Sequence, residues 1–201
     1  MNMSMSFNNL LLLSVLLLSA CATSEGPSEP VSQQDVDKAL KATSESDVQK
    51  YREAIALLGN GELDKAHDAL TEFTEDHPHL AGPWANLALI AIKRNKMEDA
   101  EKLLNKALER NPNLAQAYNL MAYIEKSRGN IVKAKDLYIK AIELKENYAL
   151  AHYNLALIYD IYIQDIPKAV AHYQKYMALN KTPDKKTAEW IEQLKASLKK
   201  G

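Results

Sequence analysis

The chain of 201 residues has a single cysteine, Cys21, so it forms no internal disulfide bond. Its formal net charge of −1 gives no strong field that would attract nucleic acid or an anionic surface. The apolar run near the N-terminus extends only from Leu10 to Ala20, too short to span a bilayer core of about 30 Å. Its length suits the hydrophobic region of a signal peptide instead.

Motifs for catalysis are also missing. The sequence has no glycine-rich phosphate loop, no HExxH and no GxSxG, and no pattern that pairs a nucleophile with a base. His77 and His79 have no third metal ligand nearby in sequence, so we interpret them as part of a surface loop. His152 and His172 fall on two predicted helices that pack together, and we interpret them as packing or partner-contact residues rather than metal ligands. We therefore expect no enzyme activity, no metal or other cofactor, and no small-molecule substrate.

What the sequence does contain is a period of 34 residues, which is typical of a repeat array. Positions of the same or a similar residue type recur in fixed phase, three of them over three copies and one over two. They are Gly61, Asn95 and Gly129; Ala66, Ala100 and Ala134; Leu70, Leu104 and Tyr138; and Pro78 and Pro112.

Each copy predicts two helices and a tight turn. In residues 81–114, apolar side chains recur at helical spacing on both sides of Asn95. Asn and Gly tolerate a left-handed backbone, so Asn95 marks the turn, and Pro112 ends the second helix. The small Ala88 and Ala100 let the two helices approach closely. One such hairpin does not bury its own apolar face, whereas stacked copies do.

This pattern resembles the tetratricopeptide repeat family in Trp84, Leu87, Ala88, Ala100, Leu104, Ala107 and Pro112. The resemblance implies an all-α fold, a right-handed α-solenoid of four hairpins closed by a capping helix. The expected repeats within 47–183 are 47–80, 81–114, 115–148 and 149–183, and the capping helix is 184–201. We expect Thr182 to cap that helix and Pro183 to open it.

The fourth copy loses the phase by one residue, because Ala169 follows Ala134 after 35 positions rather than 34. The extra residue falls in Ile161–Ile166, where Gly or Asn is expected. This predicts a longer turn than in the other copies, with Pro167 in the first turn of the next helix.

Leu18-Ser19-Ala20-Cys21 resembles the lipobox of bacterial lipoproteins. The resemblance implies a signal peptide at residues 1–20, cleavage before Cys21 and acylation of Cys21, with palmitate among the acyl groups. Met1–Asn9 lacks the Lys or Arg usual in that family. An ordinary signal peptide, or a start at Met3 or Met5, are the alternatives.

In lipoproteins of this kind an Asp after the cysteine marks retention at the inner membrane, so the resemblance implies that Ala22 favours the periplasmic face of the outer membrane. Residues 21–31 are rich in Ser, Pro, Glu and Gly and are expected to form a flexible tether. We expect residues 32–46 to form a short lead-in helix or a partly ordered segment.

In this family the first helix of each repeat lines a concave face that binds protein partners. Six of the ten tyrosines lie between Tyr148 and Tyr176, which points to the fourth repeat as the richest contact region. Carried onto this chain, the groove residues are Tyr51, Leu89, Ile92, Lys93, Asn119, Tyr123, Lys126, Tyr153, Leu157 and Asp160.

The resemblance thus implies a non-enzymatic scaffold, lipid-anchored at Cys21, that binds a protein of the cell envelope and no nucleic acid. It is similar to the pilotins of type IV or Tad pili, which guide secretin assembly. Two alternatives stay open: an adaptor for peptidoglycan hydrolases or synthases, and an accessory to a TonB-type energy-transducing system.

Overall fold

The computed structural model describes residues 44–180 and 182–199, and every regular element in those ranges is helical. The expected all-α class is confirmed. None of the described helices is long and apolar enough to cross a membrane. The elements are α3 (Glu45–Gly59), α4 (Leu63–Asp76), α5 (Ala81–Lys93), α6 (Met97–Arg110), α7 (Ala115–Ser127), α8 (Ile131–Leu144), α9 (Ala149–Leu157), η2 (Ile158–Ile163), α10 (Ile166–Leu179) and α11 (Lys185–Leu198).

Several expectations concern residues outside these ranges. The signal peptide at 1–20, the lipid attachment at Cys21, the tether at 21–31 and most of the lead-in segment at 32–46 lie outside the described residues. The end of the lead-in segment is described, and there residues 45 and 46 already belong to α3. Ser44 caps that helix, because its Oγ accepts a hydrogen bond from the backbone N–H of Asp47 at 3.1 Å.

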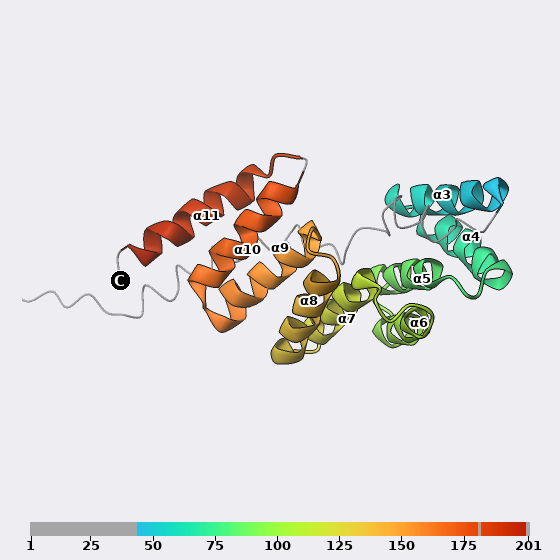
Figure 1. Cartoon of the computed structure of the whole chain (residues 1–201), viewed down its shortest axis with the longest axis horizontal. Helices are drawn as coiled ribbons and strands as arrows, with labels where there is room; N and C mark the ends of the chain where they lie inside the picture. The colour runs from blue at the N-terminus through green and yellow to red at the C-terminus, as the bar shows by residue number, and fades with distance from the viewer. Residues whose placement is uncertain (1–43, 181, 200–201) are drawn as a thin grey trace, which may run out of the picture.

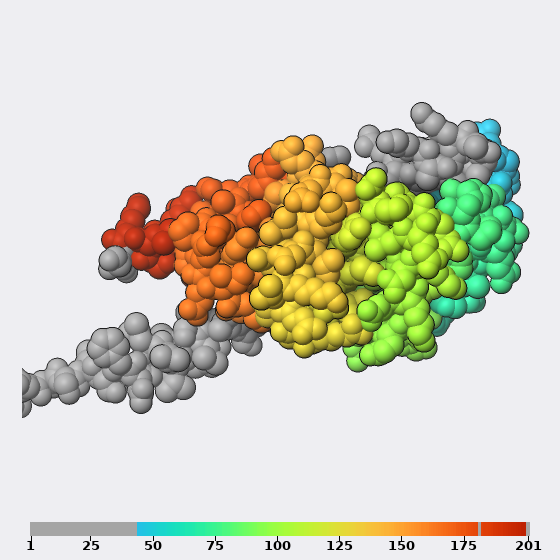
Figure 2. All heavy atoms as spheres, turned by 60° about the horizontal axis from the view of Figure 1, so that its bottom comes forward, coloured from blue at the N-terminus to red at the C-terminus, as the bar shows by residue number. Residues whose placement is uncertain are grey.

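Consecutive helices pair into hairpins, and the hairpins stack in chain order from α3–α4 to α9–α10, with α11 packed on α10 (Figure 1). Figure 2 shows the same order on the surface, where successive repeats form adjacent coloured bands along the long axis. The first helices α3, α5 and α7 also contact one another across the repeats. The array is therefore a solenoid in which each unit packs on its neighbours.

Small residues allow the helices to close on one another. Ala66, Ala100, Ala134 and Ala169 recur at the same point of each second helix, and all four are completely buried. Larger buried side chains then fill the space between the layers, and each contributes roughly 1.5–3 kcal/mol through the area it removes from water. Tyr138 takes the place that leucine occupies in the two preceding repeats, Leu70 and Leu104, and is equally buried.

The turns between paired helices use one left-handed residue each. Gly61, Asn95 and Gly129 have φ of 80°, 57° and 81°, as their phase predicts. The fourth turn uses Gln164, which has a φ of 60°. The sequence has neither Gly nor Asn in this turn. A side chain in this region costs backbone energy, so Gln164 is a strained point of the fourth repeat.

The expectation of a longer loop in the fourth repeat is wrong. The extra residue is accommodated inside the helix, which widens into the π-helical segment η2 from Ile158 to Ile163. A π-segment absorbs one additional residue while the backbone hydrogen bonds continue, so no longer loop is required. Asp165 then caps α10, and Pro167 lies in its first turn as predicted.

The start of α11 also differs from expectation. Its cap is Asp184 rather than Thr182, and Pro183 precedes the cap instead of opening the helix. The carboxylate of Asp184 accepts hydrogen bonds from the backbone N–H of Thr187 at 3.0 Å and from its hydroxyl at 2.7 Å. An ionised carboxylate accepts both bonds strongly at a helix N-terminus, and this outweighs the Thr-Pro pattern.

The turn geometry predicts opposite effects for two substitutions. Gly129→Ala should lower the free energy of unfolding by about 1–2 kcal/mol, because an added Cβ meets no atom within 4 Å and only the left-handed backbone opposes it. Gln164→Gly should raise it by up to about 1 kcal/mol by relieving the same strain. Urea denaturation of the two variants beside the wild type measures both changes. A loss of stability in Gln164→Gly would contradict the strain at that turn.

Candidate functional site

The first helices of successive repeats are joined by buried side-chain hydrogen bonds. Asn86 Nδ2 donates to Tyr51 Oη at 3.0 Å, and Gln116 Nε2 donates to Asn86 Oδ1 at 3.2 Å. Further along, Asn154 Nδ2 donates to Asn119 Oδ1 at 3.1 Å. Each bond connects one repeat to the next, and all five side chains are buried. We call these three bonds the polar ladder.

Half of the predicted groove residues are not accessible, because Tyr51 and Asn119 belong to the polar ladder and the other three pack in the hydrophobic core. Successive first helices contact one another, and the core takes up the side chains at these positions. The structure corrects the expectation that they are exposed. Five of the ten lie in the interior, with exposed fractions of 2% for Tyr51, 0% for Leu89, 4% for Ile92, 0% for Asn119 and 3% for Leu157.

The other five predicted residues keep access to solvent. Lys93 is exposed, and Tyr123, Lys126, Tyr153 and Asp160 are half-buried. Lys126 Nζ lies 5.3 Å from the centre of the Tyr123 ring, within the range of a cation–π contact. These residues come from α5, α7, α9 and η2, so the accessible set lies mainly on the third and fourth repeats.

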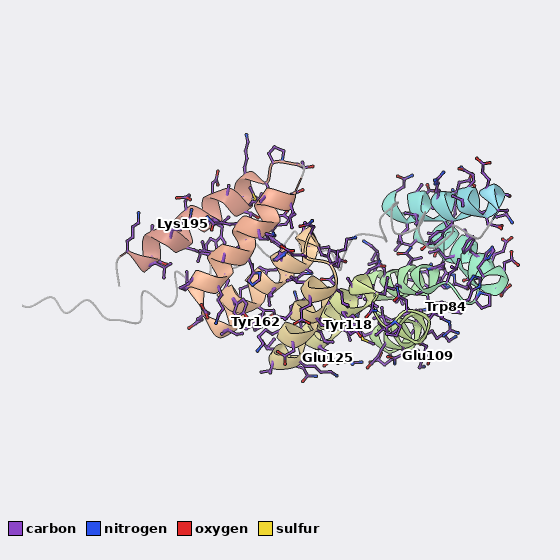
Figure 3. All side chains as sticks on the ribbon, in the orientation of Figure 1. Trp84, Glu109, Tyr118, Glu125, Tyr162 and Lys195 are labelled. Carbon is purple, nitrogen blue, oxygen red and sulfur yellow. The ribbon has the colours of Figure 1, made fainter. Side chains whose placement is uncertain are left out.

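A second repeated bond fixes the start of each first helix. The aromatic residue at the fourth position of repeats 2, 3 and 4 donates to a backbone carbonyl six residues earlier, in the joint between repeats. Figure 3 labels the first two of these side chains. The bonds are Trp84 Nε1 to Pro78 O (3.2 Å), Tyr118 Oη to Pro112 O (3.0 Å) and His152 Nε2 to Glu146 O (3.0 Å).

This repeated bond assigns a tautomer to the histidine pair. Because His152 Nε2 carries the proton given to Glu146 O, His152 Nδ1 is an acceptor, and His172 Nδ1 lies 3.0 Å from it as the donor. Burial lowers the pKa of both rings, and with His152 beside it the pKa of His172 falls to about 4. The pair is thus neutral near pH 7. Among the described residues, no group of three or more His, Cys, Asp or Glu is placed to hold a metal ion.

Aromatic side chains gather where α9, α10 and α11 meet. Tyr153 packs edge-to-face on Tyr173, with ring centres 5.7 Å apart, and lies 4.9 Å from the ring of Tyr176. Tyr176 in turn donates its hydroxyl to Asp184 at 3.1 Å, at the start of α11. We call Tyr153, Tyr173, Tyr176 and Trp190 the repeat-4 aromatic cluster.

Asp160 is a second carboxylate in this region, in addition to Asp184, and η2 positions it. Its Oδ2 accepts hydrogen bonds from Tyr173 Oη at 3.1 Å on α10 and from Trp190 Nε1 at 2.7 Å on α11. Burial raises the pKa of the carboxyl group, and the two hydrogen bonds oppose that rise only in part. Sequence reasoning found Asp160 but not its partners Tyr173 and Trp190. The one-residue change of phase was the available signal that this segment differs.

The tip of the fourth hairpin differs from the earlier tips. Arg94 and Arg128 tie the first-helix ends of repeats 2 and 3 to Asp64 and to Glu101 of the preceding repeat, the second pair at 2.8 Å. In the fourth repeat the corresponding end carries Tyr162 and Ile163, which are 49% and 43% exposed. Figure 3 shows Tyr162 at the tip of the α9–α10 hairpin. An apolar pair thus replaces a charged contact there.

At the start of α8, which η2 contacts, the surface forms an open hollow of about 820 Å³. Its lining is mostly apolar and includes Ile131, Val132 and Leu137. Val132 is 71% exposed, the highest value among the large apolar residues that the structure describes. This hollow belongs to a second helix, so it lies apart from the predicted groove.

Family models of the tetratricopeptide repeat match residues 57–124 and 115–148. Residues 57–148 therefore contain tetratricopeptide repeats, and the fold of such repeats serves as a non-catalytic scaffold for protein interactions. A search of curated protein sequences finds no match.

Solved structures with a similar fold include the following three. PilF of Pseudomonas aeruginosa has a TM-score of 0.64 and 18% identity, over 83% of this chain and 72% of that one. A thermophilic tetratricopeptide protein of Thermus thermophilus has a TM-score of 0.62 and 18% identity, over 81% and 88%. MamA of Desulfovibrio magneticus has a TM-score of 0.57 and 16% identity, over 78% and 87%. Identities this low establish the shared fold and leave the partner open.

Removing a member of the polar ladder should destabilise the array. Asn86→Ala leaves the Tyr51 hydroxyl and the Gln116 amide without this partner, so we expect a loss of roughly 2 kcal/mol or more in the free energy of unfolding. Asn105→Ala, on the exposed side of α6, is the matched control and should change stability by less than about 0.5 kcal/mol. Equal effects in urea denaturation would show that the ladder does not hold the repeats together.

Asp160 should reduce stability at neutral pH in the unbound protein. Burial makes the pKa of Asp160 higher in the folded than in the unfolded protein. The stability that the protonated carboxyl group contributes is therefore fully present below the unfolded pKa and is lost as the pH rises through the folded pKa. Asp160→Asn keeps an oxygen acceptor for Tyr173 and Trp190 but carries no charge. We expect this variant to be more stable than the wild type at pH 7.

The advantage of Asp160→Asn should shrink as the pH falls from 7 toward the ordinary pKa of aspartate, about 4, because the raised pKa lets the folded wild type take up its proton before that pH is reached. Urea denaturation of both proteins across this pH range measures the difference between their free energies of unfolding. The other titrating groups contribute equally to both proteins, so their contributions cancel in that difference. A variant that is less stable by a constant amount at every pH would indicate that the charge itself carries no cost.

Proposed function

We propose that the chain is a non-enzymatic scaffold whose concave face binds a segment of another protein of the cell envelope. The observation that carries this proposal is the accessible row of Tyr123, Lys126, Tyr153 and Asp160 on successive first helices. Tyrosines supply rigid contact area with a polar end, and they are enriched at the centres of protein interfaces. The row lies on a rigid stacked array, which suits recognition of an extended or helical segment.

The proposal includes a lipid anchor at Cys21 on the periplasmic face of the outer membrane. The sequence supports it through the apolar run Leu10–Ala20 followed directly by Cys21, and through Ala22 after the cysteine. A lipidated protein of this kind holds its repeat array close to the membrane while the array binds its partner.

Within that class we propose a pilotin-like role, in the assembly of a pilus or secretin. The similarity of fold to PilF is compatible with this role, and the same fold serves other tetratricopeptide proteins as well. A partner from the peptidoglycan machinery or from a TonB-type system would assign the same groove to a different process. The identity of the captured partner decides among the three.

Photo-crosslinking in cells tests the proposal. A photoreactive residue at position 123 or 153 of the full-length chain should capture one envelope protein, to be identified by mass spectrometry. The same residue at position 132 is the matched control, because Val132 is highly exposed on a second helix and should give only background capture. A secretin or pilus component supports the pilotin-like role, and a cell-wall enzyme or TonB-system protein would replace it.

The role of the anchor is measured in the same experiment. Cys21→Ser should remove palmitate labelling and release the chain from the outer-membrane fraction. Capture confined to position 132, with the protein present in that fraction, would contradict the assignment of the concave face.

A further inference from the structure

Asp160 carries a negative charge that the described part of the chain does not balance. Its two hydrogen-bond donors, Tyr173 Oη and Trp190 Nε1, are both neutral. In residues 44–180 and 182–199, no Lys, Arg or His lies within ion-pair distance of its carboxylate. By contrast Glu125, a buried acid of the third repeat, is paired with Lys133, whose Nζ lies 2.9 Å away. A partly buried charge without a counter-ion is costly, so its retention calls for an explanation.

Only one of the two carboxylate oxygens of Asp160 accepts hydrogen bonds within the described part of the chain. Both donors bond to Oδ2, whereas Oδ1 accepts no hydrogen bond from the described residues and is not sealed off from solvent. The two bonds to Oδ2 fix the orientation of the group from α10 and α11. Oδ1 is therefore a preorganised acceptor, held in place before any ligand arrives.

The surroundings of Oδ1 suit a cation on a long aliphatic stem. The repeat-4 aromatic cluster adjoins the carboxylate through Tyr173 and Trp190. Ile161, the next residue of η2, is 36% exposed. Lys and Arg side chains pack their methylene groups on apolar surface, place their charged heads on a carboxylate and interact favourably with aromatic rings.

We propose that Asp160 receives a Lys or Arg side chain of the segment bound in the groove, through Oδ1. This inference rests on the proposed function, because it names the chemistry of the partner at the fourth repeat. The partner segment then carries one basic residue next to apolar residues that cover Tyr153 and Ile161. The charge disfavours partners with an acidic residue at this point, so Asp160 contributes specificity as well as affinity.

A purely structural role for Asp160 makes a different prediction. If Asp160 serves only to hold α11 through Trp190, an uncharged acceptor of the same shape is sufficient. Asp160→Asn provides that acceptor while removing the charge, so it separates the two roles. Glu189→Gln is the matched control, because Glu189 is an exposed acid on α11 and its change removes one charge without touching the carboxylate site.

The test uses the full-length chain with the photoreactive residue at position 123, which leaves Tyr153 and Asp160 intact. Asp160→Asn should reduce capture of the partner by at least about tenfold, whereas Glu189→Gln should leave it unchanged. The reduction should diminish at high salt, because screening weakens the pairing in the wild type. Urea denaturation confirms that both variants are folded, and the crosslinked partner peptide should contain a Lys or Arg.

The outcomes distinguish this inference from the proposed function. Strong capture by the wild type that Asp160→Asn leaves unchanged would overturn the inference and leave the groove assignment standing. A captured segment without any basic residue would overturn it in the same way. Absence of capture from the wild type itself, with the protein in the outer membrane, would overturn the proposed function and this inference together.

Discussion

The hydrogen bonds between first helices are the constraint on which the array depends. Hydrophobic burial drives the hairpins together but has no direction, whereas Asn86 with Tyr51, and Asn154 with Asn119, bond in one register only. A slipped neighbour would leave buried amides unpaired at a cost of about 1–3 kcal/mol each. The polar ladder therefore sets how one repeat faces the next, and with it the shape of the concave face.

Packing between the helices decides which of the predicted contact residues remain accessible. In the first two repeats the predicted contact positions Tyr51, Leu89 and Ile92 are taken up by packing. The fourth repeat departs from the pattern, because η2 adds a residue, positions Asp160 and ends in exposed apolar side chains. We therefore expect an interaction specific to this protein at the fourth repeat, because that repeat departs from the family pattern.

The sequence was sufficient for the features that depend on local chemistry. The period predicted the hairpins, the phase of Gly61, Asn95 and Gly129 predicted the left-handed turns, and Pro167 predicted the start of α10. Where a feature depends on pairs of distant residues, local patterns were insufficient. The extra residue was expected in a loop, because nothing local indicates that a helix widens to keep its hydrogen bonds.

The candidate site was likewise predictable from the sequence only where it depends on local patterns. Tyr153 and Asp160 follow from the repeat register, and both keep access to solvent. The partners of Asp160 do not follow, since Trp190 is 30 residues away and depends on how α11 docks. The burial of Leu89 and Asn119 likewise depends on the spacing between repeats, which the residue types alone do not fix.

A double-mutant cycle tests the central claim most directly, namely that the fourth repeat binds its partner through the charge of Asp160. It combines Asp160→Asn with neutralisation of the basic residue in the captured partner segment and measures binding for all four combinations. The account predicts that the second change costs little once the first is made, with a coupling free energy of at least about 1 kcal/mol. Additive effects of the two changes would show that the groups do not meet.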